Sequence, residues 1–247
     1  MREVQLSIVI PTFNESDRIL GTLDSLKRYL ESRDFVWEIV LSDDGSLDDT
    51  VALVKSWSAV NLNLQDETVR IIQLNHRGKG SAVRHGMLGA VGDIRVMCDA
   101  DLAMSADQID GFISKFMEGY DIVIGSREKT GARRFDEPVI RHIMGRIFNW
   151  YVRFIAVGGF QDTQCGYKCF SSKAAESLFG MQKLDGWCFD VEILLLARKN
   201  SMKIFELPID WYHKEKSKVN PGTASIEMVR DTLLTSIRYM IGSYNKI

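Results

Sequence analysis

The chain has 247 residues, of which 45% are hydrophobic, enough to bury a sizeable core. Its formal net charge of −2 provides no overall basic field, so general nucleic-acid binding is not expected. We expect neither a signal peptide nor a membrane span, because no apolar run reaches roughly 18 residues. The four cysteines lack zinc-site spacing, which favours reduced thiols in a cytoplasmic protein, soluble or peripheral to a membrane.

The first half of the chain alternates short apolar runs with helical patterns. The runs predict strands at 4–10, 36–41, 69–74, 94–98 and 122–124. Helices are expected between them: one capped by 14–16, one after the turn at 43–46, and one from 81 to about 91. This alternation predicts an α/β fold, with a mostly parallel sheet and helices on both of its faces.

The second half is less regular. A long loop at 126–138 precedes an amphipathic helix, and 162–170 is expected to be a strand with turns. A helix at 189–199, a strand at 203–207 and a helix at 226–239 follow. No repeat, low-complexity stretch or Gly/Ser linker marks a boundary, so we expect 1–247 to be a single domain.

Polar clusters stand where the predicted strands end. They lie at 11–15, 42–46, 75–80, 99–101 and 126–127. Because open parallel sheets bind ligands beyond the carboxyl ends of their strands, the clusters are expected to converge on one edge. Their convergence predicts an active site there.

The strongest candidate within this edge is Asp99-Ala100-Asp101, directly after an apolar strand. Two aspartates at a strand end can reach one hard divalent cation, which typically keeps substrate phosphates among its other ligands. Such a cation would bridge a diphosphate and offset the charge of a leaving nucleotide. The alternative is that both aspartates form only turns and helix caps.

Two further turns are weaker candidates. In Asp43-Asp44-Gly45-Ser46 a carboxylate can accept hydrogen bonds from a ribose or a base, or merely form a turn. Gly78-Lys79-Gly80 fits neither a Walker loop nor a dinucleotide fingerprint. Its place before a helix still allows backbone amides and Lys79 to meet an anion.

The window 127–153 is basic. Seven arginine and lysine residues against three carboxylates give it a local charge of +4. A basic loop leading to an apolar and basic helix suits a lipid phosphate or an anionic membrane. The spacing of the apolar residues in that helix nevertheless favours packing into the core: Ile140, Ile143, Met144, Ile147, Tyr151 and Phe154.

Together these clusters resemble the family 2 glycosyltransferases of GT-A fold. The matching segments are SIVIPTFNE at 7–15, DDGS at 43–46, GKG at 78–80, DAD at 99–101 and IGSR at 124–127. Three longer segments are similar to the dolichyl-phosphate glucose synthase branch of the polyprenyl-phosphate glycosyltransferases: RGKGSAVR at 77–84, DTQCGYK at 162–168 and WCFDVE at 187–192. The resemblance extends over about 7–239.

The resemblance implies a nucleotide-sugar half at about 1–127 and an acceptor half, with peripheral amphipathic helices, at about 128–247. It assigns nucleotide-sugar binding to Pro11, Thr12, Glu15, Asp43, Asp44, Lys79, Asp99, Ala100 and Asp101. It assigns Mg²⁺ or Mn²⁺ to Asp99 and Asp101. It assigns binding of the acceptor phosphate to Arg127, Arg133, Arg134 and Lys168. It assigns catalytic roles to Asp101, Arg127 and Asp190.

The function implied is inverting transfer of a hexose, with glucose from UDP-glucose as first choice, onto a polyprenyl or dolichyl phosphate. Relatives in this branch carry membrane anchors or spans, whereas here the first motif lies within ten residues of Met1 and the chain ends soon after its last helix. Attachment is therefore expected to be peripheral, at the cytoplasmic membrane face.

Other functions remain open from the sequence. A transferase acting on a soluble glycan or a protein hydroxyl would need Asp190 as a base. A GDP-mannose-dependent polyprenyl-phosphate mannose synthase would share the same motifs. A non-catalytic sugar-nucleotide or membrane-binding module should lose the metal carboxylates, and a nucleotidyltransferase should carry an N-terminal glycine-rich loop; the sequence favours neither.

Overall fold

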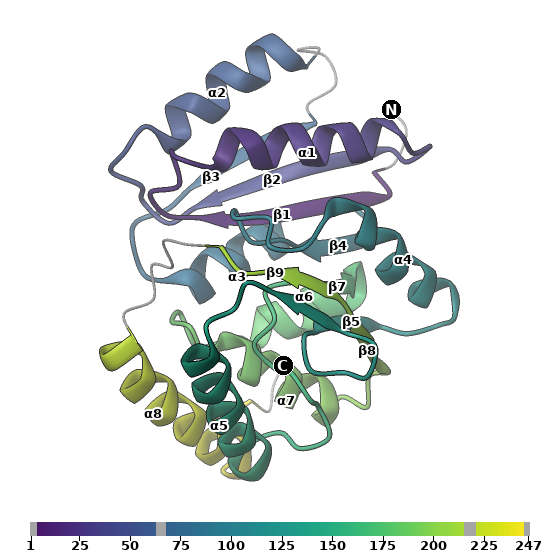
Figure 1. Cartoon of the computed structure of the whole chain (residues 1–247). Helices are drawn as coiled ribbons and strands as arrows, with labels where there is room; N and C mark the ends of the chain where they lie inside the picture. Colours follow the sequence, from purple (N-terminus) through teal and green to yellow (C-terminus); the bar gives the residue numbers. More distant parts are fainter. Residues whose placement is uncertain (1–3, 63–67, 215–220, 245–247) are drawn as a thin grey trace.

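The computed structural model describes residues 4–62, 68–214 and 221–244, with only the backbone of 221–225 (Figure 1). A seven-stranded sheet has the order β3-β2-β1-β4-β7-β5-β8. Only β7 runs antiparallel, between β4 and β5. The strands are β1 (Leu6–Thr12), β2 (Trp37–Asp43), β3 (Val69–Gln73), β4 (Ile94–Met97), β5 (Ile122–Ser126), β7 (Lys168–Ser171) and β8 (Ile204–Pro208).

Helices cover both faces of this sheet, as predicted (Figure 1). On one face lie α1 (Ile19–Glu31), α2 (Thr50–Asn61) and α4 (Ile109–Met117), which follows the short helix η1 (Ala106–Gln108). On the other lie α3 (Lys79–Gly89), α6 (Ser172–Met181) and α7 (Phe189–Lys199). Successive strand side chains point to opposite faces, so Ile8 packs in the first core and Val9 in the second.

The predicted strands of the first half are present, with shifted ends. β1, β2 and β5 each continue into the first residues of the polar clusters that were expected to follow them. The predicted cap at 14–16 is wrong: α1 begins at Ile19, and Arg18 at its N-cap makes no side-chain cap bond. The residues 14–16 instead bond to the loop after β2 and to Thr50 at the start of α2. The helices α4 and α6 were not predicted.

The second half adds a two-stranded parallel ribbon of β6 (Arg133–Phe135) and β9 (Asp210–Tyr212) and two outer helices, α5 (Val139–Ile155) and α8 (Pro221–Met240). The outer helices lie side by side, and the hydroxyl of Tyr151 donates to the carbonyl of Val229 at 3.1 Å (Figure 1). In the ribbon, the rings of Phe135 and Tyr212 stack with centroids 4.5 Å apart.

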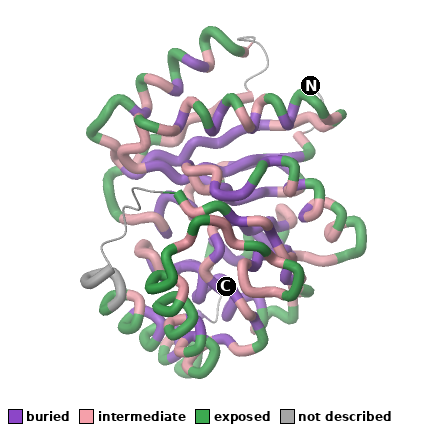
Figure 2. The backbone as a smooth tube through the Cα atoms, viewed as in Figure 1, coloured by how far each residue is buried: buried purple, intermediate pink, exposed green. Residues whose placement is uncertain are grey.

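The expectation that the apolar side chains of α5 pack into the core is confirmed only for Tyr151, which packs against the second core, and is wrong for the other residues named for it. Figure 2 shows that α5 and the described part of α8 are largely exposed. Only one side of α5, with Val152 buried, faces the protein, while apolar residues occupy most of the remaining circumference. The exposed apolar residues of α5 are Val139, Ile140, Ile143, Met144, Ile147, Trp150 and Phe154. The two helices therefore carry an apolar outer face.

The cysteines are free and buried, in agreement with the expected reduced thiols. Burial raises the pKa of the Cys165 thiol to about 11, so it remains protonated near neutral pH. None of the helices within the described residues combines the length and apolar composition needed to span a bilayer.

Candidate active site

The loops after β1 and β2 are joined by hydrogen bonds into one edge. The amide of Asn14 donates to the hydroxyl of Ser46 at 2.8 Å. The amide of Glu15 donates to the hydroxyl of Thr50 at 2.7 Å. These bonds link residues more than thirty positions apart, so the two loops hold each other in place.

Asp43 is buried at the end of β2, beside the end of β1. Its carboxylate accepts from the amide of Ser46 at 3.0 Å and from the hydroxyl of Thr12 at 3.3 Å. Pro11 and Thr12 are paired in register with Ser42 and Asp43. The structure thus brings the predicted residues Pro11, Thr12 and Asp43 together.

Asp44 joins this edge to the start of α3. Its two carboxylate oxygens accept from the amides of Arg77 at 3.0 Å and Gly78 at 2.8 Å. The ring of His76 lies 2.8 Å from the same carboxylate and stacks on Phe13, with ring centroids 4.2 Å apart. The amides before α3 therefore already have a protein acceptor, rather than pointing freely at an anion as the sequence allowed.

Asp99 and Asp101 follow β4 next to the first residue of α3. The ammonium of Lys79 lies 2.6 Å from Asp99 Oδ1. Asp101 Oδ1 accepts from the amide of Ala103 at 3.1 Å. Between them Ala100 is buried. Burial, and then the like charge of Asp99, raise the pKa of the Asp101 carboxyl above its usual range.

Gly166 borders the other side of Asp99. A Cβ atom at position 166 would stand 1.8 Å from Asp99 Oδ2, a separation no real side chain tolerates. The absence of a side chain at Gly166 therefore makes the space in which the Asp99 carboxylate lies. Asp99 is held between a glycine on one oxygen and the ammonium of Lys79 on the other.

The start of α3 packs closely on the loop 184–187. A Cβ atom at Gly80 would lie 2.7 Å from the carbonyl oxygens of both Leu184 and Gly186. The amide of Ser81 donates to the carbonyl of Asp185 at 3.1 Å. The ammonium of Lys79 lies 5.5 Å from the ring centroid of Trp187. The loop 184–187 therefore fixes where Lys79 can lie.

The two aspartates fit a divalent cation that is shared with a diphosphate. Within the described residues, no group of three or more His, Cys, Asp and Glu side chains is arranged to hold a metal by itself. Magnesium, however, is usually held by one or two carboxylates together with substrate phosphates. The oxygen donors of Asp99 and Asp101 suit that arrangement.

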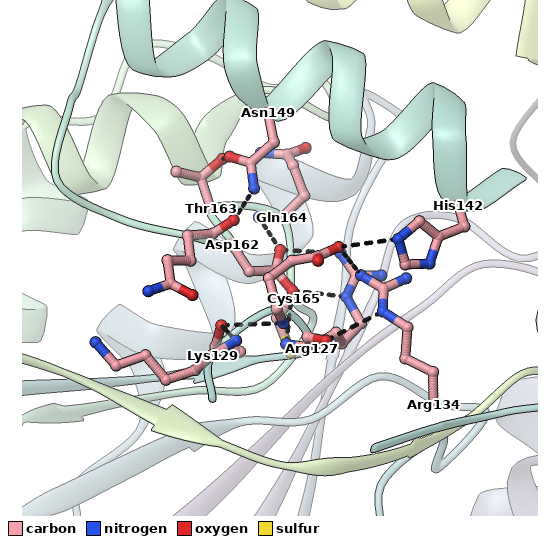
Figure 3. Close-up of polar contacts among 12 residues, drawn as sticks. Arg127, Lys129, Arg134, His142, Asn149, Asp162, Thr163, Gln164 and Cys165 are labelled. Carbon is pink, nitrogen blue, oxygen red and sulfur yellow. Dashed lines mark hydrogen bonds and ion pairs between the residues drawn. The ribbon is translucent and has the colours of Figure 1, made fainter. Parts of the chain in front are cut away.

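Arg127, after β5, forms a two-pronged ion pair with Asp162 (Figure 3). Its Nε donates to Asp162 Oδ2 at 2.7 Å and its Nη2 to Oδ1 at 3.0 Å, while its backbone amide donates to Oδ2 at 3.0 Å. The guanidinium also lies 5.4 Å from the ring centroid of Trp211. Although burial alone would raise it, these contacts lower the pKa of the Asp162 carboxyl to about 2.

Arg134 lies beside this pair at the centre of a charged cluster (Figure 3). Its guanidinium pairs with both Glu128 and Glu137, and its Nε donates to the carbonyl of Arg127 at 3.1 Å. Glu128 also pairs with Arg146 on α5, at 2.9 Å. The cluster therefore ties the loop after β5 to α5.

Two of the four expected acceptor cations lie outside this cluster. Arg133 is exposed by 67% and pairs with Asp210 on β9, with Nε and Oδ1 2.8 Å apart. Lys168 is buried in β7, and its ammonium lies 2.7 Å from Asp190 and 2.5 Å from the carbonyl of Cys165. Burial raises the pKa of Asp190, while the charge of Lys168 opposes that rise.

Sequence reasoning missed three residues that organise the site: Asp162, Gly166 and Trp187. Asp162 and Gly166 lie in the segment 162–168, which resembled known transferases but indicated only an acceptor cation. The need of Arg127 for a carboxylate partner was a usable signal, but the partner is 35 positions away. Trp187 lies in the segment 187–192, which also resembled known transferases, but the sequence indicated no target for its ring.

Comparison with known proteins extends over nearly the whole chain. The model of glycosyl transferase family 2 matches residues 7–175. A dolichyl-phosphate beta-glucosyltransferase from Trichomonas vaginalis is 33% identical over 252 residues, which cover 97% of this chain and 73% of that protein. A protein of the same name from Saccharomyces cerevisiae is 34% identical over 257 residues, 98% of this chain and 77% of that protein.

Among solved structures, glucosyl-3-phosphoglycerate synthase from Mycobacterium tuberculosis in complex with UDP has a similar fold. Its TM-score is 0.69 at 18% identity, with 95% of this chain and 79% of that chain covered. The same protein in complex with Mn²⁺, UDP and phosphoglyceric acid gives a TM-score of 0.68. These similarities confirm the GT-A fold expected from the sequence.

Proposed function

Because the chain belongs to glycosyl transferase family 2, we propose that it transfers glucose from UDP-glucose to a dolichyl or related polyprenyl phosphate. The observation that carries this proposal is its identity of 33–34% with dolichyl-phosphate beta-glucosyltransferases along 97–98% of its length. Since UDP-glucose is α-linked, a β-linked product requires inversion at the anomeric carbon.

The donor side of the proposal rests on the edge formed by the loops after β1, β2 and β4. In one domain, residues 1–127 form the nucleotide-sugar half and 128–247 the acceptor half. Buried, internally bonded loops suit a nucleotide because they are ordered before it arrives. The residues assigned to the donor are Pro11, Thr12, Glu15, Asp43, Asp44, Lys79, Asp99, Ala100 and Asp101.

A divalent cation, Mg²⁺ or Mn²⁺, would be held by Asp99 and Asp101 together with the diphosphate of the donor. When bound, the cation offsets the negative charge that develops on the leaving nucleotide. The amide of Ala103 donates to the Asp101 carboxylate and orients it, and Gly166 leaves the space that the Asp99 carboxylate needs.

The acceptor side requires no strong base. An alkyl phosphate has a second pKa near 6, by analogy with phosphorylated side chains, and is mostly a dianion near neutral pH. Asp190 is already paired with Lys168 at 2.7 Å, so its role here is to hold that ammonium. A transferase acting on a hydroxyl would instead need Asp190 within reach of the acceptor proton.

Arg127 and Arg134 are the cations assigned to the acceptor phosphate. Arg127 is held by Asp162, and Arg134 donates to the carbonyl of Arg127. Both guanidinium groups already pair with carboxylates, so in this proposal they place fixed positive charge beside the acceptor phosphate. Arg133 and Lys168 lie in separate surroundings, so in this proposal they support the site from its margins.

Because the proposed acceptor carries a lipid tail, the apolar outer face of α5 and α8 is assigned to contact with the membrane, on its cytoplasmic side. Trp150 and Phe154 are exposed by 68% and 78%, and their rings stack with centroids 6.0 Å apart. Arg146 and Arg153 are exposed on the same helix, as is typical of a helix that lies on anionic lipid. The charged cluster at Glu128 connects this helix to the loop after β5, which carries Arg127 and Arg134.

The test is incubation of the protein with labelled UDP-glucose or GDP-mannose, Mn²⁺ and a polyprenyl phosphate, followed by organic extraction. We expect glucose label in the organic phase, dependent on the polyprenyl phosphate. Mannose label there would change the donor, and label that enters only water-soluble glycan or protein would overturn the lipid acceptor.

A further inference from the structure

Lys79 contacts the same carboxylate that the proposed function assigns to the metal. Its ammonium lies 2.6 Å from Asp99 Oδ1, and its side chain is only 20% exposed. Trp187 lies 5.5 Å from the ammonium. An ammonium at this distance and a divalent cation require the same oxygen, so the two compete for Asp99.

Lysine ordinarily carries its positive charge near neutral pH. With the ammonium in contact with Asp99 Oδ1, this oxygen becomes available to a metal only when the ammonium moves.

The carboxylate of Asp99, by contrast, is bordered on one side by backbone. Its Oδ2 lies 1.8 Å from the position that a Cβ atom of residue 166 would take, so it is close to Gly166. Lysine has a flexible stem of four carbons, whereas the aspartate stem has one. When a metal takes Asp99, Lys79 is the partner that shifts.

A displaced ammonium needs a new anion. Asp190 is already paired with Lys168, and Asp101 is the other carboxylate assigned to the metal. A nucleoside diphosphate brings its own negative oxygens, so it can accept the ammonium while the metal takes Asp99. A free divalent cation brings no such compensation.

We propose that Lys79 makes metal binding depend on the nucleotide: it excludes a free divalent cation from Asp99 and yields only to a cation that arrives with a diphosphate. This inference rests on the metal role in the proposed function. It makes Lys79 a positioning residue that couples two binding events, and by linkage each of them strengthens the other.

The experiment measures Mn²⁺ affinity by electron paramagnetic resonance, with and without UDP. Wild-type protein, Lys79→Gln, Lys79→Met and Lys79→Arg are compared, with Lys115→Gln as a control at a remote lysine paired with Glu118. Lys79→Met keeps the apolar stem, which protects folding if Lys79→Gln does not fold. Because an opposite charge at contact typically changes a carboxylate's cation affinity by at least about tenfold, the neutral variants should bind Mn²⁺ alone about tenfold more tightly than wild type.

Lys79→Arg and Lys115→Gln should behave like wild type with Mn²⁺ alone, and UDP should strengthen Mn²⁺ binding less in the neutral variants than in wild type. The inference is overturned if the neutral variants bind Mn²⁺ alone no more tightly than wild type while UDP-supported binding persists. If wild type binds no Mn²⁺ beyond that held by UDP itself, the metal role in the proposed function fails instead.

Discussion

The two halves of this molecule treat charge and apolar surface in opposite ways. At the ends of β1 and β2, polar side chains are buried and hydrogen-bonded within the protein: Asp43 accepts from the amide of Ser46, and Asp44 from the amide of Gly78. Around α5 and α8, apolar side chains such as Trp150 and Phe154 lie on the outside. The first region is held in order by its own hydrogen bonds. The second exposes an apolar surface that could contact another apolar phase.

This difference matches the two substrates of the proposed reaction. A nucleotide-sugar is polar and dissolves in water, so its site gains from hydrogen-bond partners that are already fixed. A polyprenyl phosphate has its phosphate at the border of an apolar phase, so its site needs cations next to an apolar surface. Arg127 and Arg134 lie between the two regions, because their loop follows β5 and leads into α5.

The largest effect is expected from Asp101→Asn in the ordered region. The variant keeps the shape of the side chain but removes a charge assigned to the metal, and transfer should fall by about 10³-fold. Turnover is measured by organic extraction of label, and folding by thermal unfolding. Asp107→Asn, at an exposed aspartate of η1, is the matched control and should retain activity. Wild-type turnover in Asp101→Asn would remove the metal from the mechanism.

The second effect is expected from the buried pair between the halves. Asp162→Asn leaves the guanidinium of Arg127 buried without its counter-charge, which should lower the free energy of unfolding by about 3 kcal/mol. Asp210→Asn breaks the exposed pair with Arg133 and should lower the free energy of unfolding far less, because water screens that pair. Urea unfolding measures both. Equal losses in the two variants would contradict the difference in burial.

The same pair predicts how stability depends on pH. The folded-state pKa of Asp162 is lowered to about 2, so its contribution is present above an unfolded pKa of about 4 and is lost as pH falls toward 2. The wild type should therefore lose more stability than Asp162→Asn between about pH 4 and about pH 2. Parallel urea-unfolding curves for the two proteins across this range would argue against the pair.

Sequence predicted the ordered region far better than the exposed one. The strands β1, β2 and β4 are runs of buried apolar residues, so their positions were accurate to within two or three residues. β7 contains the buried Lys168, and β6 and β9 have three residues each, too few for a pattern. The helical spacing of α5 was recognised correctly. Spacing gives the apolar face but not what covers it, so the exposure of that face was not predicted.

The site shows the same limit. Strand ends located the polar clusters, because in a parallel sheet they must meet at one edge. Which groups pair there depends on distances that sequence does not contain. Lys79 contacts Asp99 from 20 positions away, and Arg127 contacts Asp162 from 35. Sequence therefore predicted which residues are candidates, and the structure showed which of them form ion pairs and with what partners.

A third effect tests the exposed region. Replacing Trp150 and Phe154 together with serine removes two exposed aromatic rings and should weaken binding to anionic vesicles by at least about tenfold. Transfer to a short, water-soluble polyprenyl phosphate should be unchanged. Val60→Ser combined with Met117→Ser, at exposed apolar residues of α2 and α4, is the control. Vesicle flotation measures binding. An equal loss of binding in the control pair would show that the outer face of α5 is not the membrane-binding surface.

The smallest effect concerns the point where α8 meets the interior. Tyr244, just after α8, is only 4% exposed, and its hydroxyl lies 2.5 Å from Glu192 Oε1. Glu192 also accepts from the amides of Lys183 and Leu184, which begin the loop that packs on Gly80. The carboxylate therefore connects the end of the outer helix to the ordered region.

Tyr244→Phe keeps the buried ring and removes one of the hydrogen bonds to Glu192, so the free energy of unfolding should fall by about 1 kcal/mol. Tyr239→Phe, at a more exposed tyrosine of α8, should have a smaller effect. UDP affinity, measured by calorimetry, should not change in either variant, because Glu192 keeps both amide donors and the loop 184–187 stays in place. A marked loss of UDP affinity in Tyr244→Phe alone would mean that the outer helices help to order the donor edge. The two regions would then form one cooperative unit.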